Sequence, residues 1–517
     1  MADPRPFTNV DPATADAARR RGRDPHELDQ ATEEMLTYIY SLLPRRPVSS
    51  KGRLTAFVAA SDGVDRISLL PDELLRTIVH RLPAKDAART AVLSSHWRAL
   101  WLSTPLVLSD AHLLREGHSW PPTPADSPAV TAAVSHILEA HPGPFHCVHL
   151  VCSHMNAYRA QLARWLQLLA AKGVQDLVLV NRPWPRAVPL PATLFTITTL
   201  TSLYLGVWKL PGTTALRGAS FPRLRELGIF CVLMEDGDVD SLVSGSPVLE
   251  ILNIQGCMKP LRLRLASQSL RCAQIGGSNT ENITVADAPR LERLILYGPW
   301  NFGRLLCTSI RIGHAPKLHT FGFLDPKKHV LVIRDTMIMA GIKVSRRAMV
   351  TSVKILNLHV RFGVYSDIKI VPTFLRCFPN VERLHITSGK CDESTGDRGL
   401  RSWDDFGPIK DVLSRIRMVT FREFRGEQSE VAFLELFFQS ARALEAAVIV
   451  LADPSFTPFS VDEALSKVKE CSKKIASKSH QVLVCEGEGP ESAELWTFQT
   501  GADFSCQDPF SLVVAVS

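Results

Sequence analysis

Residues 65–101 read DRISLLPDELLRTIVHRLPAKDAARTAVLSSHWRALW, and their pattern predicts three short helices. Pro71 opens the first helix, where its missing N–H group costs nothing, and Pro83 ends it. A second helix is expected from about Lys85 to Leu93, and one of the two serines that follow can cap a third. So short a stretch cannot bury all its apolar side chains in a core of its own. Part of this apolar surface should therefore serve docking.

The order of apolar residues and prolines in this stretch resembles the F-box, a module that docks on a Skp-type adaptor. On this resemblance the module covers residues 63–105. The adaptor would connect it to a cullin and a RING subunit, which transfer ubiquitin to whatever the rest of the chain binds. The residues that the resemblance places against the adaptor are Leu70, Pro71, Ile78, Leu82, Pro83, Val92, Leu93 and Trp97. The alternative is an ordinary helical hairpin whose leucines and tryptophans fill a core.

Beyond residue 106 a short motif recurs, in which apolar residues stand at the first, fourth and sixth positions. Its twelve copies begin at Phe145, Val174, Leu200, Leu224, Leu249, Leu270, Leu291, Leu318, Val353, Val381, Ile416 and Leu444. Successive starts lie 21 to 35 residues apart, and twelve copies are too many for chance. The longer intervals should hold loop insertions.

The motif and its spacing resemble leucine-rich repeats. The resemblance implies an α/β solenoid over residues 106–375, with parallel strands inside and helices or irregular segments outside, after the small all-helical F-box. Stacked units bury one side of each strand and leave alternate positions on the concave side. These concave positions include Asp176, Ser202, Glu226, Asn253, Gln274, Arg293, Thr320, Asn357, His385 and Thr420.

The concave positions are polar but carry no single sign of charge. Such variety favours recognition of a protein over recognition of a phosphate backbone. We predict that Glu226, Asn253, Arg293 and Asn357 contact a target protein. The alternative, for any one of them, is a solvated position without a partner.

Residues 376–452 resemble the FBD region that follows F-box and leucine-rich repeats in many plant proteins. The resemblance rests on FPNVE from Phe378, FRG from Phe424 and ALE from Ala443. The pattern predicts a strand, a turn at Gly426, a helix and a strand, which would form terminal repeats that cap the solenoid. The family region implies no enzymatic activity. Residues 453–517 are expected to form a helix and then a hairpin that turns at residues 487–490.

Residues 1–62 are expected to form a flexible arm. Ala, Arg, Pro and Asp dominate its first part, a composition that favours loose structure. One amphipathic helix is possible from Glu27 to Leu43.

The composition bounds the partners and the compartment. A net charge of +7 over 517 residues is a mild bias that does not point to nucleic acid. No segment approaches the roughly 18 to 20 uninterrupted apolar residues that would cross a membrane. The eleven scattered cysteines predict reduced thiols, and the N-terminus lacks an apolar signal core. We therefore expect the nucleus and/or the cytoplasm, with no nucleic-acid partner and no membrane.

Signals for catalysis, cofactors and metals are weak. The densest group of metal-ligand types is His146, Cys147, His149, Cys152 and His154. This group lies on a predicted strand, whose successive side chains point to opposite faces. No nucleophile, base and orienting acid can be assembled. We expect no cofactor, no metal and no enzymatic activity in this chain.

The combined patterns predict a substrate-recognition subunit of an SCF-type ubiquitin ligase. The F-box would bind a Skp-type adaptor, and through it the cullin and RING core, while the repeats would hold a target protein. The alternative is an interaction scaffold whose repeats bind a partner without ubiquitin transfer.

Overall fold

The computed structural model describes residues 7–44, 65–114, 121–182, 188–257, 259–277, 280–297, 307–390, 409–455, 459–478, 480–486 and 497–511. The chain forms two compact units. The first comprises Met1–Leu249 with Gln255–Lys259, and the second comprises Glu250–Ile254 with Pro260–Ser517.

The first unit begins with two helices, α1 (Pro12–Arg20) and α2 (Pro25–Leu42). Each has an aspartate as its N-cap and a proline at its first position, the pattern expected of a helix start. The apolar side of α2 is buried, with Leu36 and Ile39 both 0% exposed. This differs from the prediction of a flexible arm with one helix, because the apolar side of α2 packs on the rest of the unit.

Three short helices follow, as residues 65–101 predict: α3 (Asp72–His80), α4 (Ala84–Thr90) and α5 (Ser95–Ser103). Ser94 caps α5, because its hydroxyl accepts a hydrogen bond from the N–H group of Trp97. The chain then enters strand β1 (Leu106–Ser109), and Val107 pairs with Pro83 in an isolated bridge. The three helices are thus joined to the first strand of the sheet.

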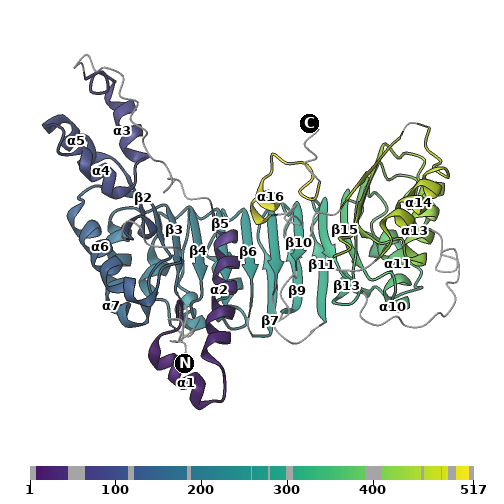
Figure 1. The fold of residues 1–517 in the computed structure, drawn as a ribbon, viewed down its shortest axis with the longest axis horizontal. Helices are drawn as coiled ribbons and strands as arrows, with labels where there is room; N and C mark the ends of the chain where they lie inside the picture. Colours follow the sequence, from purple (N-terminus) through teal and green to yellow (C-terminus); the bar gives the residue numbers. More distant parts are fainter. Residues whose placement is uncertain are drawn as a thin grey trace. The chain divides into compact units, whose positions relative to one another are not determined.

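The sheet of the first unit is parallel. Its strands lie in the order β1, β2 (Phe145–Leu150), β3 (Asp176–Val180), β4 (Ser202–Gly206) and β5 (Glu226–Phe230). The connections contain α6 (Ser127–Ala140), α7 (Arg159–Ala171), α8 (Thr213–Leu216), α9 (Asp238–Ser244), and the 3-10 turns Asp110–Leu113, Pro124–Asp126, Met155–Tyr158 and Ala192–Thr196. Helices α6 and α7 lie along one side of this sheet (Figure 1). The strands contribute buried leucines to the core.

The second unit contains a longer sheet of the same kind. Its strands lie in the order β6 (Ile251–Gln255), β8 (Cys272–Gly276), β10 (Arg293–Tyr297), β12 (Thr320–Leu324), β15 (Ile355–Val360), β16 (Arg383–Ser388), β17 (Met418–Phe424), β18 (Ala446–Leu451) and β19 (Gln481–Cys485). All twelve predicted copies of the motif form strands of the two units. The predicted α/β fold, with helices followed by parallel repeat strands, is confirmed.

A second sheet occupies four connections of the second unit, where the prediction allowed only helices or irregular segments. Its order is β14 (Thr336–Met337), β13 (His329–Ile333), β11 (Thr308–His314), β9 (Thr280–Asp287) and β7 (Leu261–Ala266). Strand β7 alternates buried leucines with exposed arginines, the pattern of a strand with one solvated face. This second sheet includes β13 and β14 between β12 and β15, so one of the two longest intervals between motifs, from Leu318 to Val353, does hold an insertion.

The C-terminal repeats carry helices α10 (Tyr365–Ile368), α11 (Val371–Cys377), α12 (Lys410–Leu413), α13 (Gln428–Ser440) and α14 (Val461–Ser472), with the 3-10 turn Arg346–Ala348 before them. Gly426 has a φ of 74° and turns the chain into α13, as predicted. Strand β19 pairs in parallel with β18, and the last residues of the predicted hairpin begin a short helix, α16 (Phe498–Ala502). The predicted turn at 487–490 lies outside the described residues.

Charged side chains that precede the strands connect neighbouring repeats of the second unit. The Arg271 guanidinium lies between Glu250 at 3.9 Å and Glu292 at 2.7 Å. Lys354 Nζ lies 2.5 Å from Glu382 in the same way. Each pair is partly solvated and contributes at most about 1 kcal/mol, so the stacked apolar core remains the main source of stability. None of the described helices is long and apolar enough to cross a membrane.

Candidate protein-interaction surfaces

Helix α3 has one buried apolar side and one exposed apolar side. Leu75 and Val79 are both 0% exposed and pack inside the three-helix module. Leu70, Leu74 and Ile78 are 37%, 51% and 37% exposed. Leu74 and Ile78 are four residues apart and lie on the same side of the helix, so they form an apolar stripe, and the exposed Leu70 lies just before the helix begins. The module leaves this stripe uncovered within the chain that the structure describes.

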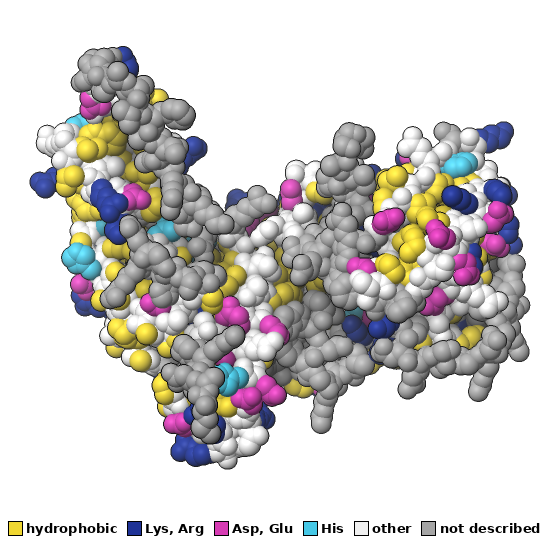
Figure 2. Space-filling model, viewed as in Figure 1, with side chains coloured by type: hydrophobic (Ala, Val, Ile, Leu, Met, Phe, Trp, Pro, Cys, Tyr) yellow, Lys and Arg dark blue, Asp and Glu magenta, His cyan; other side chains and the backbone are white. Residues whose placement is uncertain are grey.

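Further apolar side chains are exposed close to the same helices. Val92 and Leu93, between α4 and α5, are 82% and 64% exposed. Ile67 and Leu69, just before α3, are 57% and 76% exposed. We call the exposed set Ile67, Leu69, Leu70, Leu74, Ile78, Val92 and Leu93 the module patch. Figure 2 shows apolar side chains gathered over this part of the chain. Exposed apolar side chains gathered on one surface are typical of a protein-interaction site.

The structure gives the predicted adaptor residues different degrees of exposure. Leu70, Pro71, Ile78, Val92 and Leu93 are exposed, while Leu82 and Pro83 are half-buried. Ile67, Leu69 and Leu74, which the prediction does not place against the adaptor, are exposed as well. Helical spacing connects Leu74 with Ile78, four residues further along α3.

Trp97, which the prediction places against the adaptor, is largely buried within the module. The side chain is only 4% exposed, and its indole N–H group donates a hydrogen bond of 2.8 Å to Ser68 Oγ. The Ser68 hydroxyl in turn donates to Asp65 Oδ2 at 2.6 Å. Trp97 therefore fixes the segment that carries the first part of the module patch against α5, because a buried indole needs a partner for its N–H group.

The polar positions predicted for target binding lie on one side of the parallel strands in each unit. We call this side the polar face. In the first unit Asp176, Ser202 and Glu226 are paired in register and half-buried. Glu226 accepts a hydrogen bond of 3.1 Å from the hydroxyl of Tyr204, whose burial raises its pKa. Glu226 is the predicted target-binding residue that retains partial exposure.

The predicted exposure of Asn253, Arg293 and Asn357 is wrong, because the three side chains are 4%, 2% and 5% exposed. Four other predicted positions of the second unit, Gln274, Thr320, His385 and Thr420, are buried as well. The reason for Arg293 is direct: its guanidinium donates to main-chain oxygens of residues 500–506. A segment from the end of the chain thus covers a face that a repeat array alone would leave open.

Helix α2 packs on the polar face of the first unit. A Cβ atom placed on Gly206 would lie 3.4 Å from Ile39 Cγ2, and Gly206 follows Ser202 and Tyr204 on that face. The Tyr40 hydroxyl donates to the main-chain oxygen of Val151, and Arg182 donates to Tyr40. Helix α2 therefore covers part of the polar face of the first unit.

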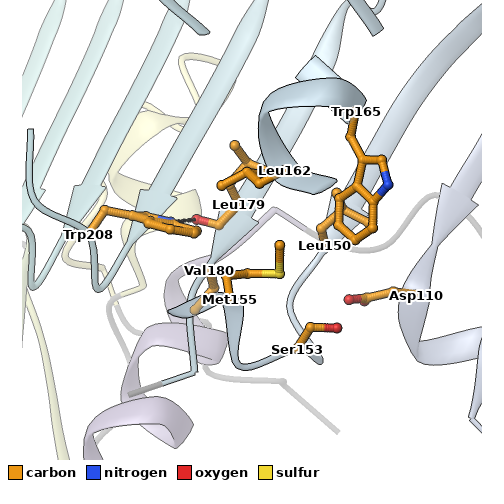
Figure 3. A pocket seen from close by; sticks show the side chains of 9 residues that line it. All are labelled: Asp110, Leu150, Ser153, Met155, Leu162, Trp165, Leu179, Val180 and Trp208. Carbon is orange, nitrogen blue, oxygen red and sulfur yellow. Dashed lines mark hydrogen bonds between the residues drawn. The ribbon is translucent and has the colours of Figure 1, made fainter. Parts of the chain in front are cut away.

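A small cavity lies where α7 packs on β2 and β3 (Figure 3). It is lined by Asp110, Leu150, Ser153, Met155, Leu162, Trp165, Leu179, Val180 and Trp208. Asp110 Oδ2 accepts hydrogen bonds of 2.8 Å from the N–H groups of both Val151 and Cys152. The Trp208 indole donates to the main-chain oxygen of Leu179 at 3.0 Å. These bonds hold the local backbone, and we assign the cavity to the core.

The histidines and cysteines of residues 146–154 lie on β2 and in the segment that follows it. Burial raises the pKa of the Cys147 thiol to about 12, which favours the protonated thiol. Among the described residues, no group of three or more His, Cys, Asp or Glu is placed to hold a metal ion.

The fold and its surfaces define a class: a helical docking module followed by a parallel repeat array suited to binding proteins. Family models match three parts of the chain. The F-box domain matches residues 67–108, the leucine-rich repeats described for FBD-associated F-box protein At5g56370 match residues 162–386, and the FBD matches residues 407–449.

Similar whole proteins come from Arabidopsis thaliana. F-box/LRR-repeat protein At3g26922 is 30% identical over 297 residues, which cover 56% of this chain and 90% of that protein. Putative F-box/FBD/LRR-repeat protein At5g44960 is 26% identical over 465 residues, or 81% of this chain and 99% of that protein. Putative F-box/FBD/LRR-repeat protein At5g22670 is 27% identical over 361 residues, or 62% of this chain and 76% of that protein. The chain belongs to the family of plant F-box proteins with leucine-rich repeats and a C-terminal FBD.

Proposed function

We propose that this chain is the substrate-recognition subunit of an SCF-type ubiquitin ligase. Its F-box binds a Skp-type adaptor, and through it a cullin and RING core, while the repeats hold a target protein. The chain itself is non-catalytic, and the chemistry of ubiquitin transfer belongs to other subunits.

The exposed apolar stripe of α3 carries the proposal. Fully burying a leucine or isoleucine side chain is worth about 1.5 to 3 kcal/mol, and the module leaves Leu74 and Ile78 partly in water. The stripe and the exposed Val92 and Leu93 together supply a group of apolar side chains that a partner could bury. An adaptor that covers the module patch would gain this burial.

The test is co-purification of the full chain with a Skp-type adaptor. A Leu74→Ala, Ile78→Ala variant removes two exposed anchors, each with an expected cost of about 2 kcal/mol in binding, so the two together should weaken adaptor binding several-hundredfold. The control is Met339→Ala, which truncates a side chain that is 57% exposed and lies outside the module. The control should bind the adaptor like the parent chain.

The outcomes separate the two predicted functions. Unchanged adaptor affinity of the double variant would contradict the proposal. If the adaptor binds but no protein that co-purifies with the chain accumulates when the proteasome is blocked, the chain is a scaffold without ubiquitin transfer.

A further inference from the structure

Residues 497–511, which we call the strap, lie across the polar face of the second unit. The main-chain oxygen of Phe498 accepts a hydrogen bond of 3.0 Å from Gln274 on β8. At the other end, the main-chain oxygen of Phe510 accepts one of 3.0 Å from Arg422 on β17. The strap, which begins with the short helix α16, thus crosses the strands from β8 to β17.

Arg293 on β10 forms hydrogen bonds with the backbone of the strap. Its guanidinium donates to the main-chain oxygens of Gly501 at 2.9 Å and Asp503 at 3.0 Å, and also to that of Cys506. The ring of Phe504 covers the guanidinium of the neighbouring Arg271, with its centroid 3.6 Å from Cζ. Bonds to main-chain oxygens do not depend on sequence, so Arg293 would accept the backbone of any peptide that follows the same course.

Two side chains of the strap, Asp508 and Phe510, make specific contacts with the polar face. Asp508 is 3% exposed and accepts hydrogen bonds from His385 Nε2 at 3.1 Å and Arg383 Nη1 at 3.3 Å. Phe510 is 2% exposed and packs against the His385 ring at 5.6 Å between centroids. A Cβ atom on Gly322 would lie 2.4 Å from Phe510 Cζ, so the absent side chain of Gly322 makes room for the phenyl ring. The face selects an acidic residue followed two positions later by an aromatic one.

The strap does not use all the hydrogen-bonding capacity of the face. Gln274 Oε1, Arg293 Nε, Asn357 Oδ1 and His385 Nδ1 are buried without a hydrogen-bond partner in the part of the chain that the structure describes. Buried polar atoms are normally paired, so an occupant that satisfied them would be favoured over the strap. This favours a strap that can be displaced.

We propose that the polar face between β8 and β17 is a peptide-binding groove, which the strap occupies as a displaceable stand-in for the target. The target segment carries an acidic side chain and, two residues later, an aromatic one. This inference rests on the proposed function, because it specifies which kind of target the repeats hold.

The experiment uses the full chain and a fluorescent peptide of residues 497–511 under reducing conditions. The protein carries Asp508→Ala and Phe510→Ala, which release the strap, and binding is followed by anisotropy. In the parent chain the tethered strap competes at a millimolar effective concentration, so the peptide should bind the variant at least tenfold more tightly. Asp508→Ala in the peptide should weaken binding at least tenfold. The control peptide, with Gln507→Ala at an exposed position, should bind unchanged.

The proposed groove would be contradicted if the peptide bound the variant and the parent chain with equal affinity. It would also be contradicted if Asp508→Ala in the peptide left the affinity unchanged. Hydrogen exchange on Gly322→Ala gives a second test if the double variant fails to fold. Faster exchange of strap amides, with α13 unchanged, is expected, and an unchanged strap contradicts the proposal. Adaptor binding is scored separately on the same proteins. Its loss alone contradicts the proposed function, whereas failure of the peptide alone contradicts the groove.

Discussion

The hydrogen bond between Trp97 and Ser68 predicts a measurable coupling inside the F-box. Ser68→Ala leaves the buried indole N–H group without a partner, which should cost about 1 to 3 kcal/mol. Trp97→Phe removes the donor, while the Ser68 hydroxyl keeps its bond to Asp65, so the lost hydrogen bond should cost about 1 kcal/mol beyond the loss of ring volume. The double variant leaves no orphaned N–H group. Its destabilisation should therefore fall short of the sum of the single costs by about 1 to 2 kcal/mol.

The assay is hydrogen exchange of the α3 and α5 amides in the full chain, because a chain with two compact units does not unfold in one step. Adaptor binding is measured alongside, at two temperatures. Trp97 acts through the fold of the module, so adaptor affinity should fall with local stability and recover on cooling. Two results would refute this reasoning. One is strict additivity of the two substitutions, and the other is lost adaptor binding with normal protection of α3 and α5, which would place Trp97 in the interface itself.

Three further outcomes are expected. Glu430 is buried at the start of α13 and accepts hydrogen bonds from two main-chain N–H groups, and burial raises its pKa. Glu430→Ala should therefore cost about 2 to 4 kcal/mol in urea unfolding, while Glu430→Gln, which keeps an acceptor, should cost less than about 1 kcal/mol. Burial lowers the pKa of His329 to about 4, and its Nδ1 accepts from the Asp325 N–H group, so the unfolded state gains a proton first as pH falls. Stability should then drop by up to about 3 kcal/mol between pH 6.5 and 4, a slope that His329→Asn should reduce in thermal melts at each pH. Gly426→Ala should cost about 1 to 3 kcal/mol in the same urea assay, because φ is 74° and the new Cβ atom would lie 3.1 Å from Ala464 Cα.

The sequence was most informative where the determinants are local. The motif that begins at Leu200 places leucines at alternate positions, and that alternation alone assigns one side of β4 to the core. Ser94 could be identified as a cap because capping needs only the next three residues. Burial of Arg293 could not be foreseen in this way. Its partners lie more than 200 residues further along the chain, and no periodicity connects them.

The same limit explains the error at the N-terminal end of the chain. The composition of residues 1–62 suggested a loose arm, but α2 is held by contacts far along the sequence, such as the hydrogen bond from the Tyr40 hydroxyl to the main-chain oxygen of Val151. Strand β7 was missed for a different reason. Its buried Leu261, Leu263 and Leu265 alternate with arginines, a readable pattern that the repeat motif does not contain.

The position of the strap also fixes an order of events during synthesis. Each repeat pairs with its neighbour as the chain grows, whereas residues 497–511 are made well after the β8 and β10 strands that they cover. At a translation rate of about 5 to 20 residues per second, the strap is synthesised roughly 10 to 40 s after Arg293. During that interval the strap does not yet cover the polar face around Arg293, so a peptide that fits the proposed groove would bind there without competition from the strap.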